Sequence, residues 1–170
     1  CLLIFDEVQV GMGRTGSLFA YEQEDVIPDV MTLAKALGGG IPIGAMCTTR
    51  ELSGALVPGT HASTFGGNPL ACAVAAAVFE ELLEGGILDH AKLMGEKLGR
   101  GLEEIAAELG PDRVIEARGR GLLRGLALAN APGPVIDRCR ERGVLVISAG
   151  GNVLRLAPPL IISADEIDHG

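Results

Sequence analysis

The 170-residue sequence lacks a long apolar run, a block of basic residues and closely spaced cysteines. Its apolar runs fall far short of the roughly 18 residues that a membrane-spanning helix needs. Its 14 Lys and Arg stand against 22 Asp and Glu, so the net charge is -8 and no cluster could neutralise a phosphate backbone. We therefore expect neither a membrane span nor a nucleic-acid partner.

The cysteines are few and far apart, and no C-x-x-C pair occurs. They are Cys1, Cys47, Cys72 and Cys139. This spacing suits neither a zinc knuckle nor a dense disulfide framework, and the three histidines have no metal-ligand spacing. We expect no metal site and a reducing, cytoplasmic environment.

Hydrophobic residues make up 48% of the chain, which is enough for the core of one to two small domains. The 25 glycines follow no collagen-like period and indicate a globular protein with many tight turns. The chain opens on Cys1 instead of Met and stops just after a predicted helix start. We expect it to be part of a longer protein.

The first half alternates short apolar runs with glycine-rich segments. Strands are predicted at Leu2–Phe5, buried on both faces, at Val30–Ala34 and at Ile43–Thr48. Asn68 and Pro69 are typical of a helix start, and the alanine-rich stretch Pro69–Leu83 predicts a helix packed on both sides. Gly85 and Gly86 end this helix.

The second half has a different pattern, which predicts a separate α+β unit. An amphipathic helix is expected over Ile87–Leu109, because apolar residues recur there at helical spacing. Ser163 and Glu166 have the spacing of a capping box. The remaining expected elements are a helix at Pro134–Arg142 and strands at Val114–Ala117, Leu122–Ala129, Val144–Ile147 and Val153–Leu156.

Two of the predicted strands end in a residue that could carry chemistry: Asp6 and Lys35. Ligands of open α/β sheets bind outside the carboxyl ends of the strands. If these two strands are parallel neighbours, a carboxylate and an amine meet at one edge. Charged residues are also common at exposed strand ends, so position alone leaves both interpretations open.

The glycines at Gly11, Gly13 and Gly16 match the G-x-G-x-x-G fingerprint of dinucleotide-binding proteins. Asp6 and Glu7 interrupt the strand before these glycines, and Thr15-Gly16-Ser17 does not open a clear helix. We reject this hypothesis as the main one and keep a dinucleotide-binding module as the alternative from another class.

Several blocks of sequence resemble, in order and spacing, the class III pyridoxal-phosphate-dependent aminotransferases, above all those acting on acetylornithine. The resemblance spans the whole chain and matches the C-terminal portion of the family. The blocks are Leu3-Ile4-Phe5-Asp6-Glu7-Val8-Gln9, Gly13-Arg14-Thr15-Gly16, Pro28-Asp29, Ala34-Lys35-Ala36-Leu37-Gly38-Gly39-Gly40, Thr64-Phe65-Gly66-Gly67-Asn68-Pro69-Leu70 and Gly150-Gly151-Asn152-Val153-Leu154-Arg155.

This resemblance implies a role for each matching residue around pyridoxal 5'-phosphate. Lys35 would form the Schiff base with the cofactor and carry protons. Asp6 would pair with the pyridine nitrogen, Val8 would contact one ring face, and Gln9 would bind the ring hydroxyl. Glu7 is a weaker candidate and is expected to be structural.

The remaining implied site residues concern the phosphate and the substrate. Thr64, with the Gly66-Gly67 turn, would reach the cofactor phosphate of a neighbouring subunit, which implies a homodimer with shared active sites. Arg155 would hold the substrate α-carboxylate in a two-bond fork, and Ser63 is expected on the substrate side. For Arg155, a structural salt bridge is the alternative.

The fold implied is the α/β fold-type-I class: the end of the large mixed-sheet domain at residues 1–85, and a small α+β domain at 86–170. The reaction implied is transamination of a terminal amine, with N2-acetylornithine as donor and 2-oxoglutarate as acceptor, a step of arginine biosynthesis. Ornithine, 4-aminobutyrate and succinyldiaminopimelate are alternative donors, and a non-catalytic relative is a third option. The chain alone is expected to be inactive, because half of the cofactor site is absent.

Overall fold

The computed structural model describes residues 1–170, which form two compact units. Unit 1 comprises Cys1–Gly13 and Ser17–Ile87, and unit 2 comprises Arg14–Gly16 and Leu88–Gly170. Unit 2 therefore includes three residues that the sequence places inside the first half of the chain.

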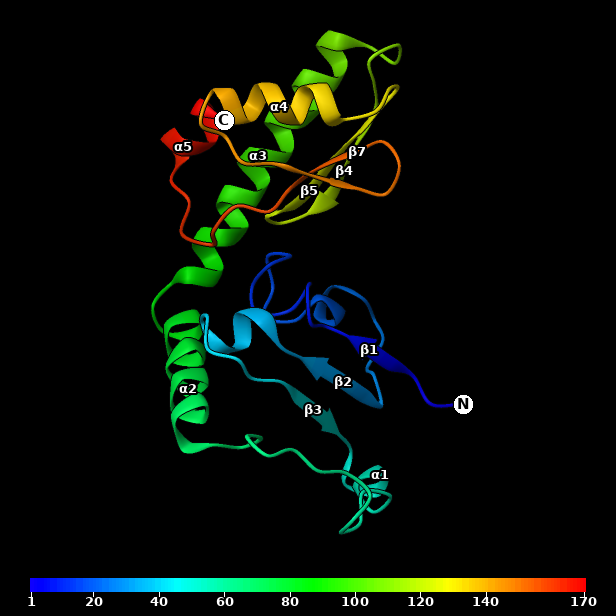
Figure 1. Ribbon diagram of the computed structural model, residues 1–170, viewed down its shortest axis with the longest axis vertical. Coiled ribbons are helices and arrows are strands. Elements are labelled where there is room, and N and C mark those ends of the chain that lie inside the picture. The colour runs from blue at the N-terminus through cyan, green and yellow to red at the C-terminus, as the bar shows by residue number, and fades with distance from the viewer. The chain divides into compact units, whose positions relative to one another are not determined.

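Unit 1 is built on a three-stranded sheet in the order β1, β2, β3 (Figure 1). Strand β1 (Ile4–Asp6) runs parallel to β2 (Val30–Leu33), and β3 (Ala45–Thr48) runs antiparallel to β2. The three strands predicted for this half are present: β2 and β3 are shorter than predicted, and β1 is shifted toward the C-terminus so that it includes Asp6. Because β1 and β2 are parallel neighbours, their carboxyl ends lie at the same edge of the sheet.

The expectation that the first strand is buried on both faces is wrong for this structure. Leu2, Leu3 and Ile4 are 56%, 39% and 61% exposed. Strand β1 lies at the edge of the sheet, so β2 is its one neighbour. An apolar run is typical of a strand buried on both faces, but unit 1 does not cover these side chains.

Helix α2 (Pro69–Leu83) has the bounds expected from the sequence. The side chain of Asn68 accepts a hydrogen bond from the backbone N–H of Ala71, and Pro69 occupies the first turn, where its missing N–H costs nothing. Its expected burial on both sides is wrong, since Leu70 is 69% exposed. The helix packs against the short 3₁₀ helix η2 (Lys35–Gly38), and this contact covers one face.

The other helices of unit 1 are single turns: η1 (Ala20–Gln23) and α1 (Arg50–Ser53). Between Glu7 and Phe19 the backbone forms turns and bends, and no helix begins at Gly16. The dinucleotide fingerprint requires a helix opening at its glycines. The dinucleotide-binding alternative is therefore wrong at the level of local structure.

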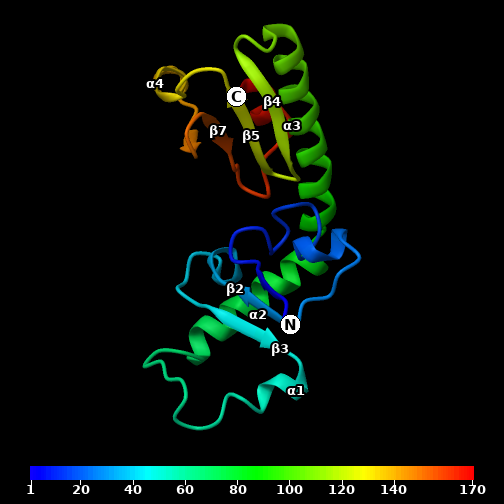
Figure 2. The same ribbon diagram turned by 90° about the vertical axis from the view of Figure 1, so that its right-hand side faces the viewer.

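Unit 2 combines a four-stranded antiparallel sheet with three helices (Figure 2). The strand order is β4, β5, β7, β6, and Figure 2 shows the long helix α3 running beside β4 and β5. The elements are α3 (Ile87–Leu109), β4 (Val114–Arg120), β5 (Leu123–Leu128), α4 (Gly133–Glu141), β6 (Ile147–Ala149), β7 (Val153–Leu156) and α5 (Ala164–His169).

The elements predicted for this half are present, but one strand is displaced. Val144–Ile147 was expected to be extended, whereas β6 begins only at Ile147. The N–H of Val144 donates to the carbonyl of Cys139 and helps to close the end of α4. Val144, whose apolar character is typical of a strand, thus belongs to the turn that ends α4.

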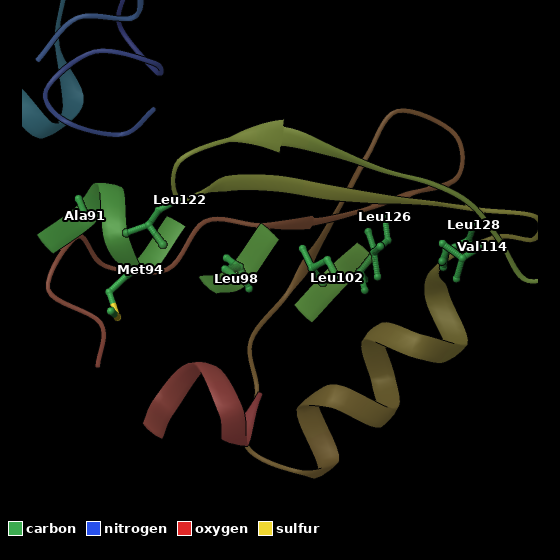
Figure 3. Packing of buried hydrophobic residues seen from close by; sticks show 9 residues of the cluster. Ala91, Met94, Leu98, Leu102, Val114, Leu122, Leu126 and Leu128 are labelled. Carbon is green, nitrogen blue, oxygen red and sulfur yellow. The ribbon is translucent and has the colours of Figure 1, made fainter. Parts of the chain in front are cut away.

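Apolar side chains of α3 and of the sheet meet in the core of unit 2 (Figure 3). Leu98 and Leu102 of α3 pack in one cluster with Leu126 and Leu128 of β5. Full burial of such a side chain contributes about 1.5–3 kcal/mol. The cluster is completed by Ala91, Met94, Val114, Leu122 and Leu154.

Two glycines allow the β4–β5 turn to approach α3 closely. A Cβ added to Gly95 would lie 2.5 Å from Gly121 backbone atoms, and one added to Gly99 would lie 2.6 Å from the Arg124 guanidinium. Arg124 donates to the carbonyls of Gly95, Gly119 and Gly121 at 2.8–2.9 Å. Burial lowers the pKa of Arg124, and the nearby carboxylate of Glu103 opposes this.

None of the helices combines the length and the apolar character that crossing a membrane requires.

Candidate functional site

Asp6 is the last residue of β1 and stands in register with Thr32 of β2. Its Oδ1 accepts a hydrogen bond from the Thr32 hydroxyl at 3.1 Å and one from the Val8 backbone N–H at 3.0 Å. The side chain is otherwise exposed. The carboxylate is therefore held on one side and open on the other.

Lys35 follows β2 and begins η2, so its amine is carried to the same edge of the sheet as Asp6. Its backbone has a φ of 49°, in the left-handed region that non-glycine residues rarely adopt. Such strain tends to persist where surrounding structure enforces it and function uses it. Lys35 itself is exposed.

The turn that carries Lys35 is held from behind by close packing. A Cβ added to Gly38 would lie 2.7 Å from Ile43, and one added to Gly39 would lie 3.1 Å from Val78 of α2. Gly39 also has a positive φ of 55°. The glycines after Lys35 therefore let this turn pack directly on α2.

Val8 and Gln9 follow Asp6 in a half-buried turn. The Val8 N–H helps to orient Asp6, a contact that sequence analysis did not anticipate. Glu7 differs from its neighbours because it is only 3% exposed. Its carboxylate accepts from the backbone N–H groups of Ala20 and Tyr21, both at 2.9 Å, and so satisfies the first donors of η1.

Ser63 and Thr64 are exposed in the loop between α1 and α2. The tight turn that follows has a hydrogen bond from the Asn68 side chain to the carbonyl of Phe65 at 2.8 Å. A Cβ on Gly66 would lie 2.8 Å from that of Ser63. The structure does not group these two residues with the Asp6–Thr32 pair.

Arg155 lies in unit 2, one residue before the end of β7, opposite Gly125 of β5 and Ile147 of β6. Arg14 belongs to the same unit and donates to the carbonyls of Leu122 and Pro158. Burial lowers the pKa of the Arg14 guanidinium, and the positive charge of Arg155 lowers it further. Unit 2 thus concentrates two guanidinium charges at one end of its sheet.

Thr32 and Arg14 have structural contacts that no sequence motif predicts. A signal for Thr32 existed, since it precedes Lys35 by three residues on the predicted strand. Its pairing with Asp6, however, depends on the register of β1 and β2. For Arg14, the partners are carbonyl groups more than one hundred positions away, which no local pattern indicates.

Comparison with known proteins identifies the family. The family model described as "Aminotransferase class-III" matches residues 1–170. This chain belongs to the class-III aminotransferases. The resemblance inferred from the sequence motifs is confirmed, as is its fold class.

Relatives of this class-III chain include the acetylornithine aminotransferase of Gloeobacter violaceus, 52% identical over 99% of the chain and 42% of that protein. Ornithine aminotransferase 1 of Staphylococcus saprophyticus is 46% identical, with coverages of 99% and 42%. A structure of the Toxoplasma gondii ornithine aminotransferase, described with partial occupancy of PLP at its active site, superposes with a TM-score of 0.92. It is 39% identical and is matched over 99% of this chain and 40% of that one. The chain thus spans about two fifths of the length of these relatives.

Proposed function

We propose that the full-length protein containing this chain is a pyridoxal-phosphate-dependent aminotransferase that uses N2-acetylornithine as amino donor and 2-oxoglutarate as acceptor. The observation that carries the proposal is the parallel pairing of β1 and β2, which brings Asp6 and Lys35 to one edge of the sheet. The names of relatives such as the Gloeobacter enzyme support this donor.

The donor and acceptor groups at this edge suit the cofactor. When bound, pyridoxal phosphate supplies an electron sink for the carbon that loses its proton. Asp6 presents an anionic carboxylate that can keep a proton on the ring nitrogen, and Lys35 presents an exposed amine that can attach to the aldehyde and move protons. Val8 and Gln9, next to Asp6 in the chain, would contact the ring face and its hydroxyl.

The remaining roles follow the family resemblance and are part of the same proposal. Arg155 would hold the substrate α-carboxylate by a planar two-bond fork. Thr64 would bind the phosphate in a partner subunit, with Ser63 near the substrate, and the exposure of this loop leaves both hydroxyls available for that purpose. We also propose a homodimer, because the role of Thr64 requires a partner subunit, and a cytoplasmic location, which the four free cysteines suit.

The test is chemical trapping on the full-length enzyme. Borohydride reduction in the presence of pyridoxal phosphate, followed by peptide mapping, should place the cofactor label on Lys35. Lys97 is a useful internal comparison, because its amine is paired with Asp168 at 2.6 Å and should stay unlabelled. A label elsewhere, or none, would refute the proposal.

Ornithine is the second candidate donor, because an ornithine aminotransferase is 46% identical to this chain. Initial rates with N2-acetylornithine and with ornithine, each at several concentrations with 2-oxoglutarate, decide between the two. A higher kcat/KM for acetylornithine supports the proposal, whereas a higher value for ornithine replaces the donor without changing the reaction class.

A further inference from the structure

The carboxylate of Asp6 receives both of its hydrogen bonds at the same oxygen. The Thr32 hydroxyl donates to Oδ1 at 3.1 Å, and the Val8 N–H donates to it at 3.0 Å. Two donors on one oxygen fix the plane of the carboxylate and turn the other oxygen, Oδ2, away from them. Oδ2 is therefore available to a third donor.

Thr32 is well placed to hold this orientation. It is the register partner of Asp6 across two parallel strands, so both side chains leave the same face of the sheet. A β-branched side chain in a strand has few accessible rotamers, so its hydroxyl has a defined position. Thr32 also lies on the strand that leads into Lys35. The same strand therefore orients the acid and leads into the turn that carries the lysine.

We propose that Thr32 is a positioning residue, whose hydroxyl orients Asp6 so that Oδ2 pairs with the protonated ring nitrogen of the cofactor. The inference rests on the proposed function, since it requires a pyridine nitrogen at Asp6. It goes beyond that function because it assigns the orientation of the acid to a side chain that touches neither cofactor nor substrate.

The experiment compares two cofactors on the full-length enzyme. Pyridoxal phosphate carries the ring nitrogen, whereas 1-deazapyridoxal phosphate has carbon in its place. Dissociation constants are measured by titrating the apoenzyme and following absorption. The variants are Thr32→Val, which keeps the shape and removes the hydroxyl, Thr32→Ala and Thr32→Ser.

The matched control is Thr48→Val. Thr48 lies in β3 of the same sheet, and its hydroxyl donates to the backbone carbonyl of Asp29 at 3.1 Å. The control variant therefore also loses one hydrogen bond. It contributes nothing to Asp6. Thermal unfolding of each apoenzyme shows whether the variants fold.

Thr32→Val and Thr32→Ala should weaken binding of pyridoxal phosphate by about tenfold, the scale of one hydrogen bond to a charged group. Binding of the deaza analogue should change less than about twofold in the same variants, a change below the scale of one net hydrogen bond. Thr32→Ser should restore most of the affinity, and Thr48→Val should affect neither cofactor.

Equal losses for both cofactors would overturn the inference and assign Thr32 a general structural role, and unchanged binding would overturn it as well. If Thr32→Val does not fold, the Ala and Ser variants decide by the same comparison. Failure of the proposed function looks different, because the unsubstituted enzyme would then carry no cofactor label on Lys35.

Discussion

At the residue scale, the guanidinium groups of Arg14 and Arg155 occupy different environments within unit 2. The Arg14 guanidinium donates to the backbone carbonyls of Leu122 and Pro158, so it links the residue before β5 to the segment after β7. Arg155 sits within β7 itself, between Gly125 and Ile147. Their mutual repulsion makes this end of the sheet favourable for an anion such as a carboxylate.

Arg155→Lys should separate substrate binding from cofactor binding. Lysine keeps the charge but loses the planar fork, so we expect KM to rise by about tenfold or more for both the amino donor and 2-oxoglutarate. Absorption of the bound cofactor should remain unchanged. Steady-state kinetics and an absorption spectrum of the full-length variant provide both measurements.

Arg118→Lys is the control for this substitution, because Arg118 lies on strand β4 of the same sheet, which does not pair with β7, and its side chain is 54% exposed. It should leave both KM values unchanged. Loss of the cofactor band in Arg155→Lys with normal substrate affinity would contradict the assignment and place Arg155 with the cofactor or the fold.

The sequence predicts the acid and the lysine but not what holds them. Asp6 and Lys35 were found because each ends a recognisable apolar run. The contact of Thr32 with Asp6 could not be predicted, because threonine is common in strands and the contact depends on the register between β1 and β2. The same limit applies to Glu7, whose burial depends on η1 folding back over it.

At the element scale, three glycines of α3 differ in how much space surrounds them. Gly95 faces the Gly121 backbone, Gly99 faces the flexible Arg124 side chain, and Gly101 has no atom within 4 Å of an added Cβ. All three lie in the body of the same helix. Their differences therefore come from packing and not from helix propensity.

Substitution of these glycines by alanine should have opposite effects on stability. Gly95→Ala forces two backbone segments apart and should lower the free energy of unfolding by about 1–3 kcal/mol, the usual cost of overpacking a core. Gly101→Ala should raise it by about 0.5–1 kcal/mol, because alanine favours the helix and meets nothing. Urea unfolding of the full-length variants measures both values.

Gly99→Ala should fall between these two variants, because the Arg124 guanidinium can move while losing hydrogen bonds. Equal stability of the Gly95→Ala and Gly101→Ala variants would contradict the effect expected from packing. The pair is informative because both changes add the same methyl group to the same helix.

Element boundaries were predictable where local chemistry sets them. Asn68 and Pro69 fix the start of α2, and Ser163 with Glu166 forms the capping box of α5. The Ser163 bonds also lower the pKa of Glu166. Burial was not predictable in the same way: α2 is apolar all round, yet only Ala71, Ala75 and Leu82 are buried, since burial depends on what packs against a helix.

At the scale of the whole molecule, large apolar side chains are exposed on unit 1. Ile27 is 85%, Phe65 81%, Leu70 69% and Ile4 61% exposed. Exposed apolar surface and an open strand edge both favour association with other chains. The residues 1–170 produced alone should therefore self-associate. They should also show no aminotransferase activity, because they span about two fifths of the length of the related enzymes.

Sedimentation and light scattering of the isolated chain over a range of concentrations test this expectation. The mean mass should exceed 17.5 kDa and rise with concentration. The full-length enzyme, measured in parallel, should have one concentration-independent mass. A monodisperse 170-residue monomer with transaminase activity would contradict the prediction.

Membership of Arg14–Gly16 in unit 2 has a consequence for recombination between related enzymes. A chimera joined at Gly86 would inherit residues 14–16 from one parent and the rest of unit 2 from the other. Gly121, whose added Cβ would lie 2.4 Å from the Thr15 carbonyl carbon, leaves no room for a bulkier parental residue there. Chimeras that fold should therefore take Arg14–Gly16 and Leu88–Gly170 from the same parent. The gene segments that encode unit 2 are thus two, and they are not contiguous.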